Sequence, residues 1–213
     1  MPIPRIIHQM WIGDQSKRPS ALMQTWKDMN LSCEYIVWTE ENLQYINFHN
    51  QKQIDAMPEL NGKCDIMRYE ILYKFGGVFM DADTKCVATL DDFFFDTTDR
   101  FTCWENEAVG KDPETGVQLV ASGHQGCKRD DGFYLFCITE LWNIDASAGR
   151  AWQVCGNRFL KSMVDKCRNI YPMTIYPSHY FIPKHGTGVE YKGDGKVYSE
   201  HYWGTTHNLY GKI

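Results

Sequence analysis

The sequence predicts an α/β fold in which a mainly parallel sheet is flanked by helices. Strand-like and helix-like segments alternate along the chain, and 213 residues are enough for one domain with a well-buried core. Hydrophobic residues make up 43% of the sequence and charged residues 23%, which is typical of a globular protein. Because no repeat, linker or low-complexity tract divides the chain, we expect a single domain over residues 1–213.

Two strands and an amphipathic helix open the chain. Residues 5–13 (RIIHQMWIG) indicate a buried strand that ends at Gly13, and residues 34–40 (EYIVWTE) indicate a second strand. Between them, a Pro-Ser start and one apolar face predict a helix over residues 19–30. That face consists of Leu22, Trp26 and Met29.

A long helix and a third strand meet at two glycines. Residues 47–60 are weakly patterned as a helix, whereas residues 64–77 predict the clearest helix of the chain. Asp65 is expected in the first turn of that helix, where a carboxylate suits the helix dipole, and Gly76-Gly77 end it. Residues 77–84 (GVFMDADT) are then predicted to form a strand.

The second half of the chain continues the alternation with shorter segments. We expect strands over 101–105 and 117–123, helices over 130–143 and 151–169, and late extended segments over 174–183 and 196–204. Repeated alternation of this kind covers a mainly parallel sheet with helices.

Charge and cysteine usage exclude several classes of protein. The net charge is −5 and no Lys/Arg cluster occurs, so we expect no nucleic-acid partner, which would require a basic face. No apolar run is long enough for a signal peptide or a membrane span. The eight cysteines are scattered without a C-x-x-C pair, which indicates reduced thiols and a cytoplasmic protein.

The D-x-D sequence of Asp81 and Asp83 is the first candidate site. It follows an apolar strand, and ligands of open α/β sheets bind beyond the carboxyl ends of the strands. Residues i and i+2 of an extended chain project to the same side, so the two carboxylates are able to share one divalent cation and leave positions open for diphosphate oxygens. A polar turn after a strand would give the same short sequence, and for an isolated D-x-D that interpretation is favoured.

Asp65 and Arg68 form the second candidate group. They lie three residues apart on one face of a helix that leads through the two glycines into the aspartate strand, so four charged groups are expected at one edge of the sheet. By spacing alone, the alternative is a surface salt bridge worth less than ~1 kcal/mol.

Residues 64–84 (CDIMRYEILYKFGGVFMDADT) resemble the signature of the D-x-D glycosyltransferases of family 32 and are similar to the catalytic domains of the large clostridial glucosylating toxins. Four further segments resemble the family's segments in the same order: residues 3–13, 153–160, 175–183 and 201–208. Because these segments together span nearly the whole chain, it is identified as a member of this family. It is also similar to the first domain of a multi-domain glycosyltransferase of a large virus of green algae, which makes capsid glycans.

The resemblance implies a GT-A fold, which is a Rossmann-like, mainly parallel mixed sheet flanked by helices, and a nucleotide sugar bound with Mn²⁺ or Mg²⁺. At the matching positions it implies that Asp83 is a direct metal ligand and that Asp81 binds both the metal and the donor. It also implies that Asp65 and Arg68 contact sugar hydroxyls and a phosphate oxygen. His201 is implied as a late ligand to the metal or the diphosphate.

An aromatic site for the base follows from the same resemblance. Trp11 is expected to stack on uracil, with Phe79 lining the same pocket. The resemblance also implies that Trp203, Thr206 and His207 lie beside His201 on a closing loop. It further implies that Gln125 contacts the donor sugar. The chain departs from the family pattern at Cys64, Phe79, Asn157 and His207, where relatives often carry Ser, Tyr, Pro and Trp.

The function so implied is metal-dependent transfer of a hexosyl or deoxyhexosyl group from a UDP-sugar to a hydroxyl of a glycan acceptor, with retention of configuration. No nucleophile is evident in the sequence, so the departing phosphate is expected to accept the acceptor's proton. Residues 186–206, with five glycines, are expected to form a lid that excludes water. If the protein is viral, we expect it in the cytoplasm of the host cell. Further domains of the same polypeptide are expected as partners.

Two other classes of protein are compatible with the motif. A phosphatase or phosphotransferase of the haloacid-dehalogenase type also carries D-x-D after an apolar strand, but it requires Thr or Val where Lys85 stands and a motif near the N-terminus. A noncatalytic sugar-binding module is supported only by the aromatic content of 14%.

Overall fold

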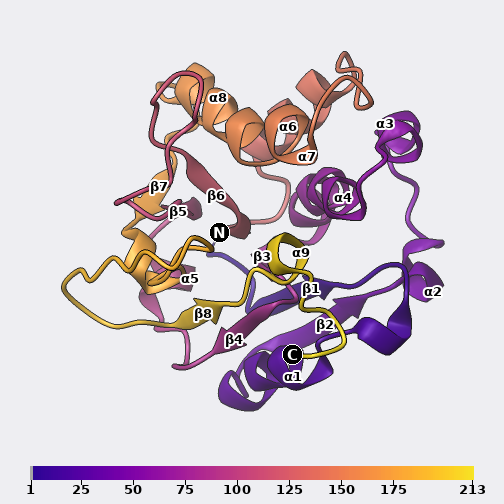
Figure 1. The fold of residues 1–213 in the computed structure, drawn as a ribbon. Helices are drawn as coiled ribbons and strands as arrows, with labels where there is room; N and C mark the ends of the chain where they lie inside the picture. Colours follow the sequence, from indigo (N-terminus) through magenta and orange to yellow (C-terminus); the bar gives the residue numbers. More distant parts are fainter. Residues whose placement is uncertain (1) are drawn as a thin grey trace.

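The computed structural model describes residues 2–213, which are arranged around a central sheet of six strands (Figure 1). The strand order is β2-β1-β3-β6-β5-β7, and β4 and β8 form a separate two-stranded sheet. The strands are β1 (Ile6–Met10), β2 (Glu34–Trp38), β3 (Gly77–Met80), β4 (Thr84–Cys86), β5 (Arg100–Trp104), β6 (Val120–Cys127), β7 (Thr174–Tyr176) and β8 (Ser199–His201).

The direction of the strands confirms a mainly parallel mixed sheet. β1 pairs in parallel with β2 and with β3, and β5 pairs in parallel with β7. β6 is antiparallel to both of its neighbours, β3 and β5. The carboxyl ends of β1, β3 and β5 therefore lie at the same edge of the sheet, which is where ligands bind in folds of this class.

Helices cover both faces of the sheet. They are α1 (Ser20–Met29), α2 (Glu40–Leu43), α3 (Gln51–Ala56), α4 (Leu60–Phe75), α5 (Phe93–Asp96), α6 (Gly132–Leu141), α7 (Ala151–Val154), α8 (Asn157–Cys167) and α9 (Gly204–His207), with short 3₁₀ turns at Gln15–Lys17 and Ser178–Tyr180. Figure 1 shows α4, α6, α7 and α8 on one face and α1 on the other. Each face has its own apolar core, one around Tyr69 and Phe133 and the other around Trp26 and Phe94.

Three helix predictions need correction. The weak helix expected over 47–60 is only the short α3, Gln51–Ala56. The helix expected over 151–169 is divided into α7 and α8 at Gly156, where the chain passes so close to the Asp65 carboxylate that a Cβ atom would lie 2.9 Å from its Oδ2. The long helix α4 begins at Leu60, so Asp65 lies in its second turn rather than its first.

The end of α4 and the start of β3 are fixed by a buried histidine. His8 donates from Nε2 to the carbonyl oxygen of Gly76 at 2.8 Å, and its Nδ1 accepts from Trp38 Nε1 at 3.2 Å. Both ring nitrogens of this fully buried side chain are thus satisfied in the neutral form, and burial lowers its pKa to about 4. His8 is therefore a structural residue bonded to the backbone.

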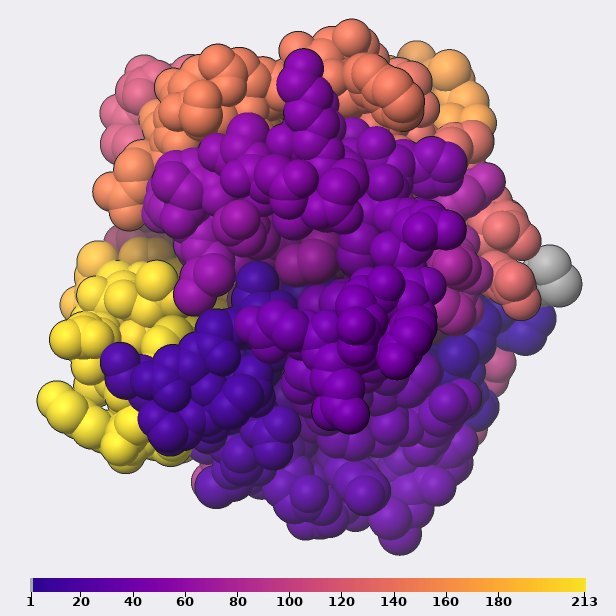
Figure 2. Space-filling model, turned by 90° about the vertical axis from the view of Figure 1, so that its right-hand side faces the viewer, coloured from indigo at the N-terminus to yellow at the C-terminus, as the bar shows by residue number. Residues whose placement is uncertain are grey.

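The C-terminal segment returns to the start of the chain. Figure 2 shows the yellow C-terminal residues lying against the indigo N-terminal segment. At this junction the rings of Trp11 and Tyr210 meet edge to face with centroids 4.7 Å apart. Within residues 2–213, no helix is long and apolar enough to cross a bilayer.

Candidate active site

The two aspartates stand on a tight turn rather than on an extended strand. β3 ends at Met80, and both the backbone N–H and the hydroxyl of Thr84 donate to the carbonyl oxygen of Asp81, at 3.2 and 2.6 Å. The prediction that the strand runs through residue 84 is therefore wrong. The two carboxylates still come together, because the turn rather than the strand alternation brings them to one side.

His201 completes a group of three potential metal ligands. It lies on β8 directly opposite Thr84 of β4, and its Nε2 is 3.6 Å from Asp81 Oδ2 and 3.6 Å from Asp83 Oδ1. One ligand atom from each of the three side chains lies within 4.8 Å of the others. Within residues 2–213 this is the one such group of His, Cys, Asp and Glu side chains.

This donor set fits a divalent cation. Two carboxylates and one imidazole offer oxygen and nitrogen ligands, a combination that suits Mn²⁺, whereas Mg²⁺ prefers oxygen alone. Burial would lower the pKa of His201, but the carboxylates of Asp83 and Asp81 outweigh it and raise that pKa to about 9. A bound cation would relieve the same concentration of negative charge.

Arg68 links the D-x-D turn to α4. Its guanidinium contacts the Asp81 carboxylate, lies 3.2 Å from Asp65 Oδ1 and donates to the carbonyl oxygen of Ser122. It also lies over the ring of Phe79 at 4.7 Å. The Asp65–Arg68 pair predicted from spacing is present, but the side chains are only 10% and 4% exposed, so the surface salt bridge alternative is wrong.

Burial and charge control the ionisation of these groups. Burial raises the pKa of Asp65 to about 7, although the charge of Arg68 opposes that change. Burial would likewise raise the pKa of Asp81, but Arg68 and His201 together outweigh it and hold that pKa well below its ordinary value. Both neighbours therefore favour the ionised form, which a metal ligand requires.

A cleft of about 1060 Å³ surrounds these groups. Nine of the predicted site residues line it, namely Trp11, Asp65, Arg68, Phe79, Asp81, Asp83, His201, Trp203 and Thr206. Gln125 and His207 do not. Gln125 is fully buried and bonded to Ser122 and Tyr134, and His207 is exposed on α9.

The C-terminal segment is tied to the metal-ligand group. Asp83 Oδ2 accepts from the backbone N–H of Gly204 at 2.7 Å, and Trp203 packs against His201 with ring centroids 4.5 Å apart. Trp203 adopts a left-handed backbone conformation, with φ of 56°, just before α9. Tyr210 thus contacts Trp11, and both residues line the cleft together with residues of α9.

Sequence reasoning missed Glu105 and its polar network in the wall of the cleft. Glu105 Oε2 accepts from Asn157 Nδ2 at 2.6 Å, and Asn157 Oδ1 accepts from the hydroxyl of Ser122 at 2.8 Å. His124 is also buried in the cleft wall, and neither of its ring nitrogens has a hydrogen-bond partner within residues 2–213. Glu105 follows the carboxyl end of β5, so the rule that identified the D-x-D turn would also have identified this residue.

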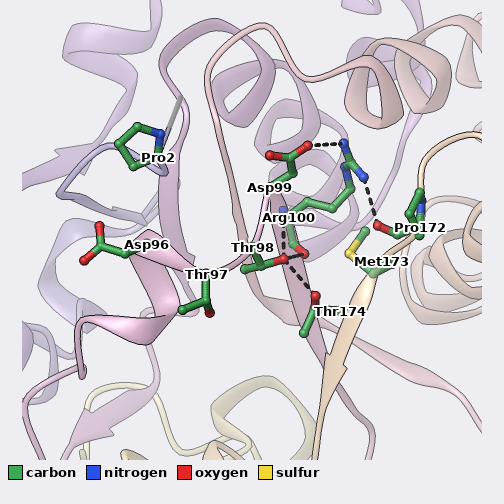
Figure 3. Close-up of a pocket in the computed structure, with 9 residues that line it drawn as sticks. All are labelled: Pro2, Asp96, Thr97, Thr98, Asp99, Arg100, Pro172, Met173 and Thr174. Carbon is green, nitrogen blue, oxygen red and sulfur yellow. Dashed lines mark hydrogen bonds and ion pairs between the residues drawn. The ribbon is translucent and has the colours of Figure 1, made fainter.

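A second hollow, of about 610 Å³, lies beside the start of β7 (Figure 3). Its one arginine, Arg100, is fully engaged: Nε and Nη2 each donate to the Asp131 carboxylate at 2.9 Å, and Nη1 donates to the carbonyl oxygen of Pro172 at 2.8 Å. The nearby Asp99 pairs with Lys128 at 2.6 Å. These groups stabilise the fold, so we place the active site in the larger cleft.

Residues 16–100 match the family described as "Glycosyltransferase sugar-binding region containing DXD motif". The chain is 30% identical over 219 residues to inositol phosphoceramide mannosyltransferase 1 of Schizosaccharomyces pombe, covering 92% of this chain and 65% of that protein. It is 29% identical over 133 residues to inositol phosphoceramide mannosyltransferase 3 of the same yeast, covering 57% of this chain and 34% of that protein. The chain thus spans less than two thirds of the length of either relative.

A solved structure supports the fold. It is described as a glycosyltransferase involved in the glycosylation of the major capsid of PBCV-1, and it superposes with a TM-score of 0.56 over 97% of this chain and 96% of that one. At 11% sequence identity this likeness shows the fold alone. The expected GT-A type of mainly parallel mixed sheet is confirmed.

Proposed function

Because residues 16–100 carry the sugar-binding region with the DXD motif of glycosyltransferases, we propose that this chain transfers a hexosyl or deoxyhexosyl group from a UDP-sugar to a hydroxyl of a glycan acceptor. One observation carries the proposal. Asp81, Asp83 and His201 converge in a cleft large enough for a nucleotide sugar, and Trp11 and a buried polar network also line it.

A divalent cation bound by Asp81, Asp83 and His201 would neutralise charge on the diphosphate leaving group. The residues of the chain prepare that site. Arg68 directs its guanidinium at protein groups, so we assign it to holding Asp81 ionised and in place, rather than to the phosphate contact that the resemblance implies. Asp83, anchored to Gly204, ties the C-terminal segment to the site.

The donor is proposed to lie along the cleft in a fixed direction. Trp11 would stack on the base, supported by Tyr210, whose ring holds the indole from one edge. The diphosphate would then lie over the D-x-D turn, and the sugar would lie beyond it, near Asp65. Trp203 and α9 would close over the donor and exclude water, which would otherwise compete with the acceptor hydroxyl.

The transfer step is proposed to retain the anomeric configuration. The bond between the anomeric carbon and the diphosphate oxygen breaks, the acceptor oxygen bonds to the same face of that carbon, and the acceptor's proton passes to the departing phosphate. Asp65 and Asp81 would bind donor hydroxyls during this step. We further propose that residues 1–213 act as one catalytic domain.

A panel of nucleotide sugars tests the proposal. UDP- and GDP-linked glucose, galactose, mannose and rhamnose are incubated with the protein and Mn²⁺, and release of the nucleoside diphosphate is followed; mannose is included because both yeast relatives are named mannosyltransferases. We expect hydrolysis of at least one UDP-sugar, lost with EDTA. Phosphate release from p-nitrophenyl phosphate would instead support a phosphatase, and binding of free sugar without hydrolysis of any donor would support a noncatalytic module.

A further inference from the structure

Glu105 is a buried carboxylate that lines the cleft. It lies outside residues 16–100, the region that matches the glycosyltransferase family. It follows β5 directly, at the same edge of the sheet as the D-x-D turn, and is only 6% exposed. Its backbone is fixed on both sides: its N–H donates to the carbonyl oxygen of Leu119 at 2.9 Å, and its carbonyl oxygen accepts from Gln118 Nε2 at 2.9 Å. The backbone that carries this side chain is therefore fixed at the end of β5.

Only one of the two carboxylate oxygens of Glu105 is satisfied. Oε2 accepts from Asn157 Nδ2, and Oε1 has no hydrogen-bond partner within residues 2–213. The orientation of Asn157 is not free, because its Oδ1 accepts from both the hydroxyl and the N–H of Ser122, at 2.8 and 3.3 Å. A buried carboxylate oxygen without a donor costs free energy, and a ligand that donates a hydrogen bond would recover it.

Two different sets of contacts connect Trp11 and Glu105 to the D-x-D turn. Trp11 contacts Tyr210, and the Asp83 carboxylate is tied to Gly204 in the same segment. Asp81 lies beside Asp83 and is held by Arg68. Arg68 in turn donates to Ser122, which leads through Asn157 to Glu105. If the base lies at Trp11 and the diphosphate over the D-x-D turn, the group beyond them at Glu105 is the sugar.

We infer that Glu105 is a specificity-determining residue whose Oε1 accepts a hydrogen bond from one hydroxyl of the sugar being transferred. The inference rests on the proposed function, since it needs a glycosyl donor in the cleft. A carboxylate oxygen is an acceptor only, so it favours a ring that presents a hydroxyl at that position. A donor analogue that lacks this hydroxyl would leave the oxygen buried and without a hydrogen-bond partner, so the protein should discriminate strongly against that analogue.

The test separates binding of the sugar from binding of the nucleotide. Glu105→Gln keeps the shape and keeps an oxygen for Asn157, but presents an amide N–H₂ to the cleft in place of Oε1. Calorimetry with Mn²⁺ measures the affinity of UDP and of the UDP-sugar that the wild-type protein hydrolyses. We expect the affinity for UDP to change by less than twofold and the affinity for the UDP-sugar to fall roughly ten- to hundredfold.

Two controls accompany this variant. Glu114→Gln removes a carboxylate that is 63% exposed on the neighbouring loop, and it should leave both affinities unchanged. Glu105→Asp keeps the charge but shortens the side chain by one methylene, which withdraws the oxygen from the cleft. It replaces Glu105→Gln in the same binding measurements if the Gln variant does not fold. Donors with a deoxy-sugar give a measurement that a purely structural role of Glu105 would not affect. The wild-type protein should bind the donor that lacks one particular hydroxyl much more weakly than the parent UDP-sugar, whereas Glu105→Gln should not distinguish the two.

Each other outcome overturns the inference. Equal loss of UDP and UDP-sugar affinity would mean a structural role. A change confined to the KM for the acceptor would move Glu105 to the acceptor side, and a large loss of kcat with a sugar–protein adduct detected by mass spectrometry would make it a nucleophile. A wild-type protein that binds and hydrolyses no nucleotide sugar overturns the proposed function as well, whereas an active wild-type with an unaltered Glu105→Gln variant overturns the inference alone.

Discussion

Replacing Arg68 by methionine is the sharpest test of how the site is held together. The guanidinium is 4% exposed and lies between the carboxylates of Asp65 and Asp81. Methionine keeps an unbranched stem over Phe79 but removes the charge, so the buried carboxylate of Asp65 and the 29% exposed carboxylate of Asp81 are left facing each other. Breaking a buried ion pair in this way costs about 3–5 kcal/mol, which for a chain of this size corresponds to a fall in Tm of about 6–20 °C.

Urea unfolding followed by tryptophan fluorescence measures this loss. The matched control is Arg5→Met, because Arg5 also pairs with two carboxylates, those of Asp92 and Asp96, but is 37% exposed and its partners are 81% and 54% exposed. The control should lose no more than about 1 kcal/mol. The triple variant Arg68→Met/Asp65→Asn/Asp81→Asn should recover most of the loss, because no uncompensated charge remains. If Arg68→Met were as stable as the control, or if the triple variant recovered nothing, the electrostatic account of the site would be refuted.

Three further predictions concern single residues. In the folded state the pKa of His8 is about 4, below its ordinary value of 6.5, so as the pH falls the unfolded state takes up a proton before the folded state does. The free energy of unfolding should therefore decrease by about 3 kcal/mol as the pH is lowered from 6.5 to about 4. In urea melts at a series of pH values, His8→Gln should not show this part of the decrease. Trp11→Ala should weaken UDP binding roughly 5- to 150-fold in calorimetry if the indole stacks on the base, and an unchanged affinity would remove it from the donor site. Gly123→Ala adds a Cβ atom against the Asp81 carboxylate and should weaken Mn²⁺ binding, measured by manganese EPR, at least tenfold. Gly149→Ala, at a glycine without a positive φ whose added Cβ atom meets only the side chains of Val154 and Gln153, controls for general effects, and equal Mn²⁺ affinity in both variants would count against Asp81 as a ligand.

Much of the fold was predictable because local patterns control it. The buried strand before Asp81 and the helix that ends at Gly76 are strongly patterned, and both form close to where they are expected. The weak segment over 47–60 and the break at Gly156 were not predictable. The first has little apolar periodicity, and the second depends on close approach to Asp65, about 90 positions earlier in the chain.

The site was predictable where its residues share one segment. Asp65, Arg68 and the two aspartates lie within 19 consecutive residues, and their convergence follows from a helix that leads into a strand. The arrival of His201 depends on the pairing of β8 with β4, which no local pattern reports and which the resemblance alone suggested. The link between Glu105 and Asn157 joins β5 to α8, 52 positions apart, and has no sequence signature.

The central claim is that the D-x-D turn and His201 hold a divalent cation that joins the protein to a diphosphate. Calorimetric titration of UDP with and without Mn²⁺, in the wild-type protein and in Asp83→Asn, tests it most directly, because the amide still accepts the bond from Gly204 and only the charged ligand is removed. We predict that Mn²⁺ raises the affinity of the wild-type protein for UDP at least tenfold and has no effect on the variant. The same UDP affinity in all four titrations would contradict the account.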